Sequence, residues 1–154
     1  MVMDTQKAKR VLRSIHKISH KHFVLHGSLT RSNTILARKP SLDTWRNTRK
    51  AKGIREKGVY ATRLVDLAVL YATLPNDTMW RRVKKGRYIR ILYQKPELIL
   101  FRGFIHVCRA DSFDKRALIT VSKRSVKVVR TFRITPEVFM YLWEKKQLRI
   151  FDRP

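Results

Sequence analysis

The stretch VKKGRYIRILY (residues 83–93) opens the part of the chain that decides its fold. Ile89, Ile91 and Tyr93 occupy alternate positions in it, which is the pattern of a strand with one buried face. Three more segments rich in β-branched and aromatic residues follow, namely ILFRGFIHVCRA (residues 99–110), RALITVSK (116–123) and SVKVVRTFRI (125–134). The region from Val83 to Val138 therefore predicts a mainly β fold, built as a small antiparallel barrel or sheet of four or five strands.

Short turn-forming segments separate these strands. Pro96 lies in the first break, where it cannot donate a hydrogen bond to a β-ladder. Asp111, Ser112 and Asp114 lie in the second break, and Asp and Ser favour turns by bonding their own backbone. Breaks of this length are typical of neighbouring strands in an antiparallel sheet.

Two other segments have helical patterns. In Tyr60–Leu74 the apolar residues recur every three or four positions along one face, and Pro75 ends the helix that this spacing predicts. A second helical spacing follows Pro136, in Val138, Phe139, Leu142 and Trp143. Leu148–Phe151 is then expected to form a last short strand that closes the sheet.

The charge of the chain indicates its kind of partner. The 154 residues include 36 Lys and Arg but only 11 Asp and Glu, which gives a net charge of +25. A compact domain with this charge repels itself and is usually held by a polyanion, most commonly a nucleic acid. A membrane surface is the other candidate, but no apolar run approaches the length that spans a bilayer.

The N-terminal third of the chain is the most basic part. We expect residues 1–58 to form a basic arm, extended or helical on RNA, and residues 59–154 to form the domain with the short helix and barrel. Gln6–Ser28 lacks acidic residues and has helical apolar spacing, which suits either a mitochondrial targeting helix or a basic helix on RNA. Arg31–Lys57 has too little apolar surface to fold alone, so we expect RNA to order the arm, with Phe23 and Trp45 as anchors.

The residues that could support a reaction or bind a metal do not form a convincing set. His16 with His20, and His22 with His26, have helical i, i+4 spacing, but a zinc site needs two such pairs or added cysteines. Cys108 is the only cysteine, so no intrachain disulfide forms; it shares a strand face with His106 but lacks a third orienting group. Asp111 and Asp114 are commonly turn-formers. We therefore predict no catalytic residues, no metal and no cofactor.

The order of the β motifs resembles that of one family, bacterial large-subunit ribosomal protein nineteen with its organellar relatives. Gly86, Ile89 and Ile91 lie where the family has a Gly-Asp strand with alternating Val. Further matches are Phe101-Arg102-Gly103 at its Phe-Glu-Gly strand, Ile119–Lys123 at Phe-Thr-Val-Arg-Lys, and Arg130–Pro136 at Arg-x-Phe-Pro-Leu-His-Ser-Pro. The similarity covers roughly residues 64–154, and its strength lies in the ordered set of motifs.

Departures from the family pattern point to a fast-evolving organellar member. Arg87 replaces the Asp after the first Gly, and Arg102 replaces the Glu of Phe-Glu-Gly. The first hairpin is short, the Gly-rich link before the last signature is missing, and the basic tail is reduced to residues 145–149. These changes affect the fine contacts with rRNA more than the barrel.

The resemblance implies a fold and a function. The fold would be a small SH3-like β-barrel of the translation-protein type, preceded by a short helix and a long basic N-terminal extension. The protein would be a structural constituent of the large subunit of the mitochondrial ribosome, in the matrix and near the subunit interface. Its partners would be large-subunit rRNA, neighbouring large-subunit proteins and small-subunit rRNA at the interface, without a membrane or small-molecule substrate. The alternative is a non-ribosomal barrel-type factor that binds RNA or DNA.

Alternation and the match to apolar family positions also predict the core, and basic residues predict the RNA contacts. The inward-pointing side chains are expected to be Ile91, Phe101, Ile105, Val121 and Phe132. The predicted RNA-binding residues are Arg31, Arg38, Lys39, Arg46, Arg49, Lys50, Lys52, Arg55, Arg81, Arg82, Lys84, Lys85, Arg87, Lys123, Arg124, Lys127, Arg130 and Arg133. Such phosphate contacts position a protein without reading the base sequence.

Overall fold

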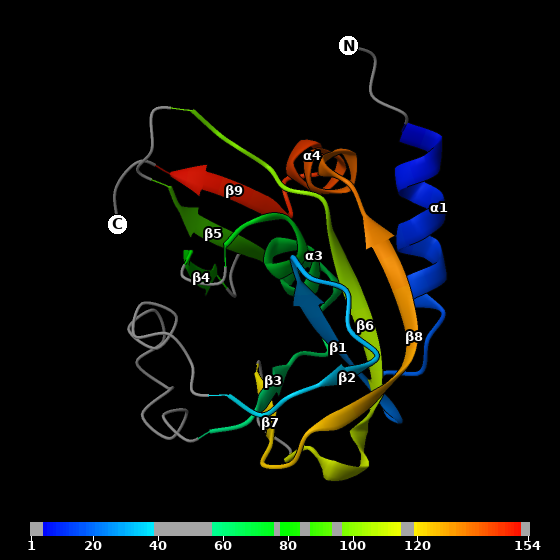
Figure 1. The fold of residues 1–154 in the computed structure, drawn as a ribbon. Helices are drawn as coiled ribbons and strands as arrows, with labels where there is room; N and C mark the ends of the chain where they lie inside the picture. Colours follow the sequence, from blue (N-terminus) through cyan, green and yellow to red (C-terminus); the bar gives the residue numbers. More distant parts are fainter. Residues whose placement is uncertain are drawn as a thin grey trace.

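The chain forms a mainly β structure, and in its described residues the helices α1, α3 and α4 pack among the sheets (Figure 1). The computed structural model describes residues 5–38, 57–75, 78–83, 87–93, 97–114 and 119–151. The elements are α1 (Thr5–His16), β1 (Phe23–Ser28), β2 (Thr34–Ile35), β3 (Val59–Ala61), α3 (Val65–Thr73), β4 (Met79–Val83), β5 (Tyr88–Leu92), β6 (Gly103–Arg109), the 3-10 helix η2 (Ala110–Ser112), β7 (Thr120–Ser122), β8 (Val126–Ile134), α4 (Pro136–Glu144) and β9 (Leu148–Phe151). The strand segments predicted around β5, β6, β7 and β8 are thus confirmed.

The main sheet has the strand order β1-β6-β8-β2, and it curls into a half-barrel. β6 lies at its centre, antiparallel to β1 on one side and to β8 on the other. A register shift between Val107 and Cys108 bends this ladder, as a β-bulge does. β3 and β7 form a separate two-stranded sheet, and a bridge between Leu25 and Thr62 connects β1 to the residue after β3.

The strand predicted at residues 83–93 belongs to a different sheet from the strands that follow it. β5 pairs with β4 in an antiparallel hairpin and with β9 in parallel. The predicted C-terminal helix and closing strand are confirmed as α4 and β9, and β9 closes this smaller sheet beside β5. The chain leaves this sheet after β5 and returns to it through β6, β7, β8 and α4, and a long connection of this kind allows β9 to run parallel to β5.

Helix α3 lies at the centre of the molecule (Figure 1), and most of its residues are buried. The predicted helix is confirmed, although it begins at Val65 because Val59–Ala61 forms β3. Its expected single apolar face is wrong: a helix that is hydrophobic all round lies inside a core. α3 packs on the main sheet on one side and contacts α1 and α4 on others.

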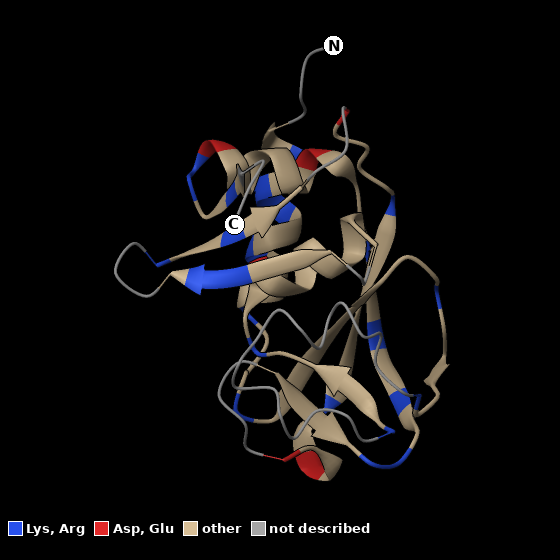
Figure 2. Cartoon of the chain, turned by 90° about the vertical axis from the view of Figure 1, so that its left-hand side faces the viewer, with Lys and Arg blue, Asp and Glu red and all other residues tan. Residues whose placement is uncertain are grey.

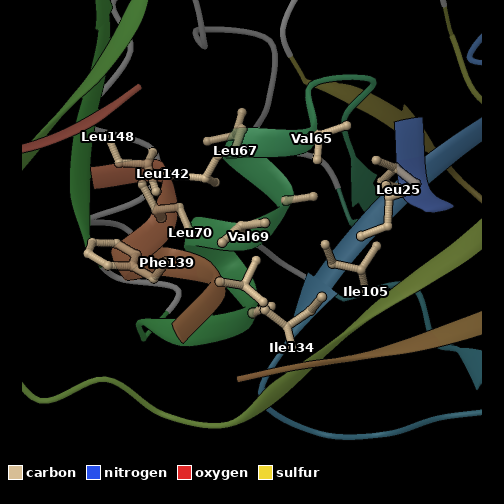
Figure 3. Close-up of a cluster of buried hydrophobic side chains, with 14 of the residues drawn as sticks. Leu25, Val65, Leu67, Val69, Leu70, Ile105, Ile134, Phe139, Leu142 and Leu148 are labelled. Atoms are coloured by element: carbon tan, nitrogen blue, oxygen red, sulfur yellow. The ribbon is translucent and has the colours of Figure 1, made fainter. Parts of the chain in front are cut away.

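The main core surrounds α3 and joins the main sheet to the β4-β5-β9 sheet. Figure 3 shows Leu67, Leu70 and Val69 of α3 among side chains from the sheets and from α4. A smaller second cluster lies between the main sheet and the β3-β7 pair, and it is built from Val24, Ile35, Val59, Ala61, Cys108, Phe113 and Val126. Because the main sheet contributes to both clusters, it is covered on both faces.

The prediction that residues 1–58 form an arm outside the folded domain is wrong for residues 5–38. The apolar stripe of α1 (Ala8, Leu12 and Ile15) is buried in the main core. β1 pairs with β6 along its whole length, from Phe23 opposite Arg109 to Ser28 opposite Phe104. The N-terminal apolar residues, too sparse to fold alone, are buried by pairing with strands far along the chain. Trp45 and residues 39–56 lie outside the described residues.

Four of the five predicted core side chains are buried, namely Ile91, Ile105, Val121 and Phe132. Phe101 is 42% exposed, so its assignment to the core is wrong. It precedes β6 and lies in irregular chain, where strand alternation does not apply. Its backbone N–H donates to the carbonyl of Thr73 at 2.8 Å, so the backbone is anchored while the side chain remains outside.

A pair of leucine substitutions tests whether β1 belongs to the core. Leu25 is fully buried, whereas Leu29 just after β1 is 36% exposed. Leu25→Ala should lower the free energy of unfolding by about 2–5 kcal/mol, because it leaves a cavity beside α3. Leu29→Ala should change it by less than about 0.5 kcal/mol. Urea titrations of the free protein measure both values, and equal small changes would mean that β1 is detached in solution.

Candidate nucleic-acid interface

The predicted basic residues that the structure describes lie at the surface. Nine of them are exposed and Arg82 is half-buried; the exposed ones are Arg31, Arg38, Arg81, Arg87, Lys123, Arg124, Lys127, Arg130 and Arg133. The other predicted residues, Lys39, Arg46, Arg49, Lys50, Lys52, Arg55, Lys84 and Lys85, lie outside the described residues. Figure 2 shows blue Lys and Arg segments on helices, strands and turns at both ends of the molecule, while red segments are few.

The basic residues of β8 do not all share one side of the sheet. Arg130 lies opposite Val107, a residue of the main core, and Arg133 lies opposite Phe104. Successive side chains of a strand point to opposite faces, so these two arginines, three residues apart, lie on different faces. The Arg130 guanidinium lies 4.4 Å from the centre of the Phe132 ring. The basic residues of β8 therefore cannot all contact one phosphate backbone from a single side of the sheet.

A basic groove that the sequence analysis did not identify lies between α1 and α4. Its volume is about 420 Å³, and Lys9, Arg13 and His16 line it from successive turns of α1. Tyr141 and Lys145 line it from the end of α4, with the Lys145 ammonium 5.6 Å from the centre of the Tyr141 ring. One sign of this groove was present in the sequence, namely the repeat of cations every three or four residues in a helix without acids. Only the packing of α1 beside α4 creates the groove itself.

Residues 5–38 contain no acidic residue, so every charged side chain on the exposed side of α1 is basic. Arg13 and His16 occupy the last turn of α1, where the helix dipole favours positive charge. A phosphate backbone approaching this helix would meet several cations without a competing carboxylate on the same segment. The cations of the groove can therefore hold phosphate groups, above a floor to which Leu12 and Leu142 contribute.

The histidines have mainly structural surroundings. The helical pairing expected for His22 and His26 is wrong, because His26 lies in β1 and His22 in the turn before it. Within the described residues, no group of three or more His, Cys, Asp or Glu side chains is arranged to hold a metal ion.

His26 and His106 lie opposite each other in the β1-β6 ladder, with ring centres 5.9 Å apart. His26 Nδ1 donates to the Tyr60 carbonyl at 2.7 Å, and His106 Nδ1 lies 3.3 Å from the His26 carbonyl. His106 Nε2 accepts the Ser32 N–H at 3.0 Å, which requires the neutral ring. Burial lowers the pKa of His26 to about 4 and also lowers that of His106. Both rings therefore bind backbone groups as neutral donors and acceptors.

Cys108 and His106 lie on one strand face, as their spacing predicted. Cys108 is fully buried in the second cluster, and burial raises the pKa of its thiol to about 12. A thiol in this state is a poor nucleophile, since the thiolate is the reactive form. The geometry gives Cys108 a packing role and His106 a role in holding Ser32.

The two acids of the turn after β6 also have structural contacts. Asp111 belongs to η2, and the Asp114 carboxylate accepts hydrogen bonds from the Thr120 hydroxyl at 3.1 Å and from the Val121 N–H at 3.2 Å. These bonds tie the turn to the start of β7.

No helix among the described residues is long and apolar enough to cross a membrane.

The lowered pKa of His26 predicts a loss of stability in acid. Between about pH 6.5 and pH 4 the unfolded chain binds a proton that the folded His26 does not. The free energy of unfolding should therefore decrease by up to about 3 kcal/mol as the pH falls through this window. His26→Gln retains an amide donor for Tyr60 and removes the titration, so its stability should depend less on pH. Urea titrations at several pH values measure this, and an unchanged pH slope would refute the role of His26.

The basic surface is therefore inferred from the residues of this chain alone. No known protein family matches the chain, no curated protein is similar to it, and no solved structure resembles it.

Proposed function

We propose that this protein binds RNA through its basic surface, as a structural component of the large subunit of the mitochondrial ribosome. The observation that carries the binding is the placement of the basic side chains. Of the predicted residues that the structure describes, all but Arg82 are exposed, and the α1-α4 groove adds Lys9, Arg13 and Lys145. Cations spread over several surfaces suit contacts with phosphates on more than one side.

The hydrogen bonds of the polar side chains support a binding role over a catalytic one. His26, His106 and Asp114 are engaged in hydrogen bonds that hold turns and strands together. The Cys108 thiol is buried and protonated. A role without catalysis needs only a stable scaffold that displays charge, and the described residues provide this.

The ribosomal part of the proposal comes from the ordered motifs that resemble large-subunit ribosomal protein nineteen. Under this proposal the protein lies in the mitochondrial matrix, near the subunit interface, and contacts large-subunit rRNA, neighbouring proteins and small-subunit rRNA. The curled main sheet is compatible with the proposed SH3-like barrel, with β1 as an added edge strand. The alternative is a non-ribosomal factor with the same scaffold that binds RNA or DNA.

Salt dependence tests the binding itself. If the protein neutralises six to ten phosphates, its affinity for RNA should drop by roughly 10³–10⁵ between about 50 and 200 mM salt. A fluorescence anisotropy titration with a labelled RNA measures the slope. A flat response would contradict a polyanion as the main partner.

Sedimentation separates the ribosomal proposal from the alternative. A structural component should migrate with the large subunit through a high-salt wash, because it is held by many contacts at once. An accessory factor should be released under the same wash. Tagged protein expressed in a mitochondriate cell and followed across a sucrose gradient gives the result, with an established large-subunit protein as the control.

A further inference from the structure

The outer face of the β4-β5-β9 sheet carries three arginines in one row. Arg81 pairs directly with Arg90 across β4 and β5, and Arg90 pairs directly with Arg149 across β5 and β9. Their neighbours Trp80, Ile91 and Leu148 are buried, so the arginines lie on the opposite, outward face. Directly opposed side chains have Cβ atoms about 5 Å apart, so the three arginines form a continuous row across the sheet.

Two more cations flank this row at one end. Arg87 immediately precedes β5 and Lys146 lies shortly before β9, and these strands are parallel, so both residues lie at the same end of the sheet. Both residues have positive φ, 50° and 60°, a conformation that glycine adopts far more easily. The end of α4 accounts for the turn at Lys146, whose N–H donates to the Trp143 carbonyl at 2.9 Å. The end of α4 does not explain why the residue at position 146 is a cation.

An aromatic ring lies within the same face. The guanidinium of Arg149 lies 4.0 Å from the centre of the Tyr88 ring, and its Nε donates to the Lys146 carbonyl at 3.4 Å. Tyr88 is half-buried on this outward face, opposite Val83. Bases of single-stranded RNA stack on aromatic rings and on guanidinium planes, while the backbone follows a row of cations.

We infer that the outer face of the β4-β5-β9 sheet binds a single-stranded RNA segment, with Arg81, Arg90 and Arg149 on its phosphates and Tyr88 with Arg149 beneath a base. This inference rests on the proposed RNA binding and assigns it a surface and a form of RNA. The predicted residues Arg81 and Arg87 belong to this face, whereas Arg149 and Tyr88 were not predicted.

The test compares two double variants that remove the same charge. Arg81→Gln/Arg149→Gln removes two cations of the row, and Lys17→Gln/Lys21→Gln removes two exposed lysines that lie outside both the α1-α4 groove and the β4-β5-β9 sheet. In titrations of labelled oligouridine, the arginine variant should lose about 1.4 from the slope of log affinity against log salt. The lysine variant should retain the slope. Arg81→Lys/Arg149→Lys should retain most of it too, and thermal unfolding of each variant shows that it is folded.

Tyr88→Ala tests the stacking. It should weaken oligouridine binding about fivefold or more and leave binding to duplex RNA nearly unchanged. Equal slopes for the arginine and lysine variants, equal effects of Tyr88→Ala on single strands and duplexes, or competition by polyglutamate as strong as by oligouridine would each overturn the inference. In those cases the wild type still binds RNA and the proposed function stands. A wild type that binds no RNA would overturn both.

Discussion

Helix α3 lies so close to the main sheet that two strand positions accept only glycine. A Cβ on Gly103 would overlap the Ala72 carbonyl oxygen, and a Cβ on Gly27 would overlap that of Ala68. The small residues of α3 and the glycines of β1 and β6 thus let two backbones approach directly. The rest of the fold depends on this contact, because α1, α4 and the smaller sheet all pack around the helix that it fixes.

The central helix also explains how polar groups are tolerated inside. The Thr73 hydroxyl donates to the Val69 carbonyl at 2.8 Å, within the helix itself. The Trp80 Nε1 donates to the Tyr71 hydroxyl at 2.6 Å, and the two rings meet edge to face. Both bonds satisfy polar atoms of side chains in the core, and the bond between Trp80 and Tyr71 also joins β4 to α3. The β4-β5-β9 sheet is thereby fixed to the core, while its outer face carries charged side chains.

Charge is the opposing constraint in this structure. The apolar side chains are concentrated around α3, and the cations are displayed on α1, on β8 and on the outer face of the β4-β5-β9 sheet. Repulsion among these cations lowers the stability of the free protein, and a polyanion relieves it. An RNA-binding role therefore accounts for the high positive charge, which otherwise lowers the stability of the fold.

The sequence alone determined the local elements, since strand alternation around Ile89, Ile105 and Val121 and helical spacing around Leu67 and Phe139 depend only on neighbouring residues. It also determined the basic character of the surface, because charge is a sum over residues. The pairing of β1 with β6 and of β5 with β9 was decided by the tertiary structure alone, since each joins segments far apart in the chain. For the same reason Leu25 is buried, Phe101 is exposed, and Arg81, Arg90 and Arg149 form a row: the neighbours across a sheet decide these outcomes.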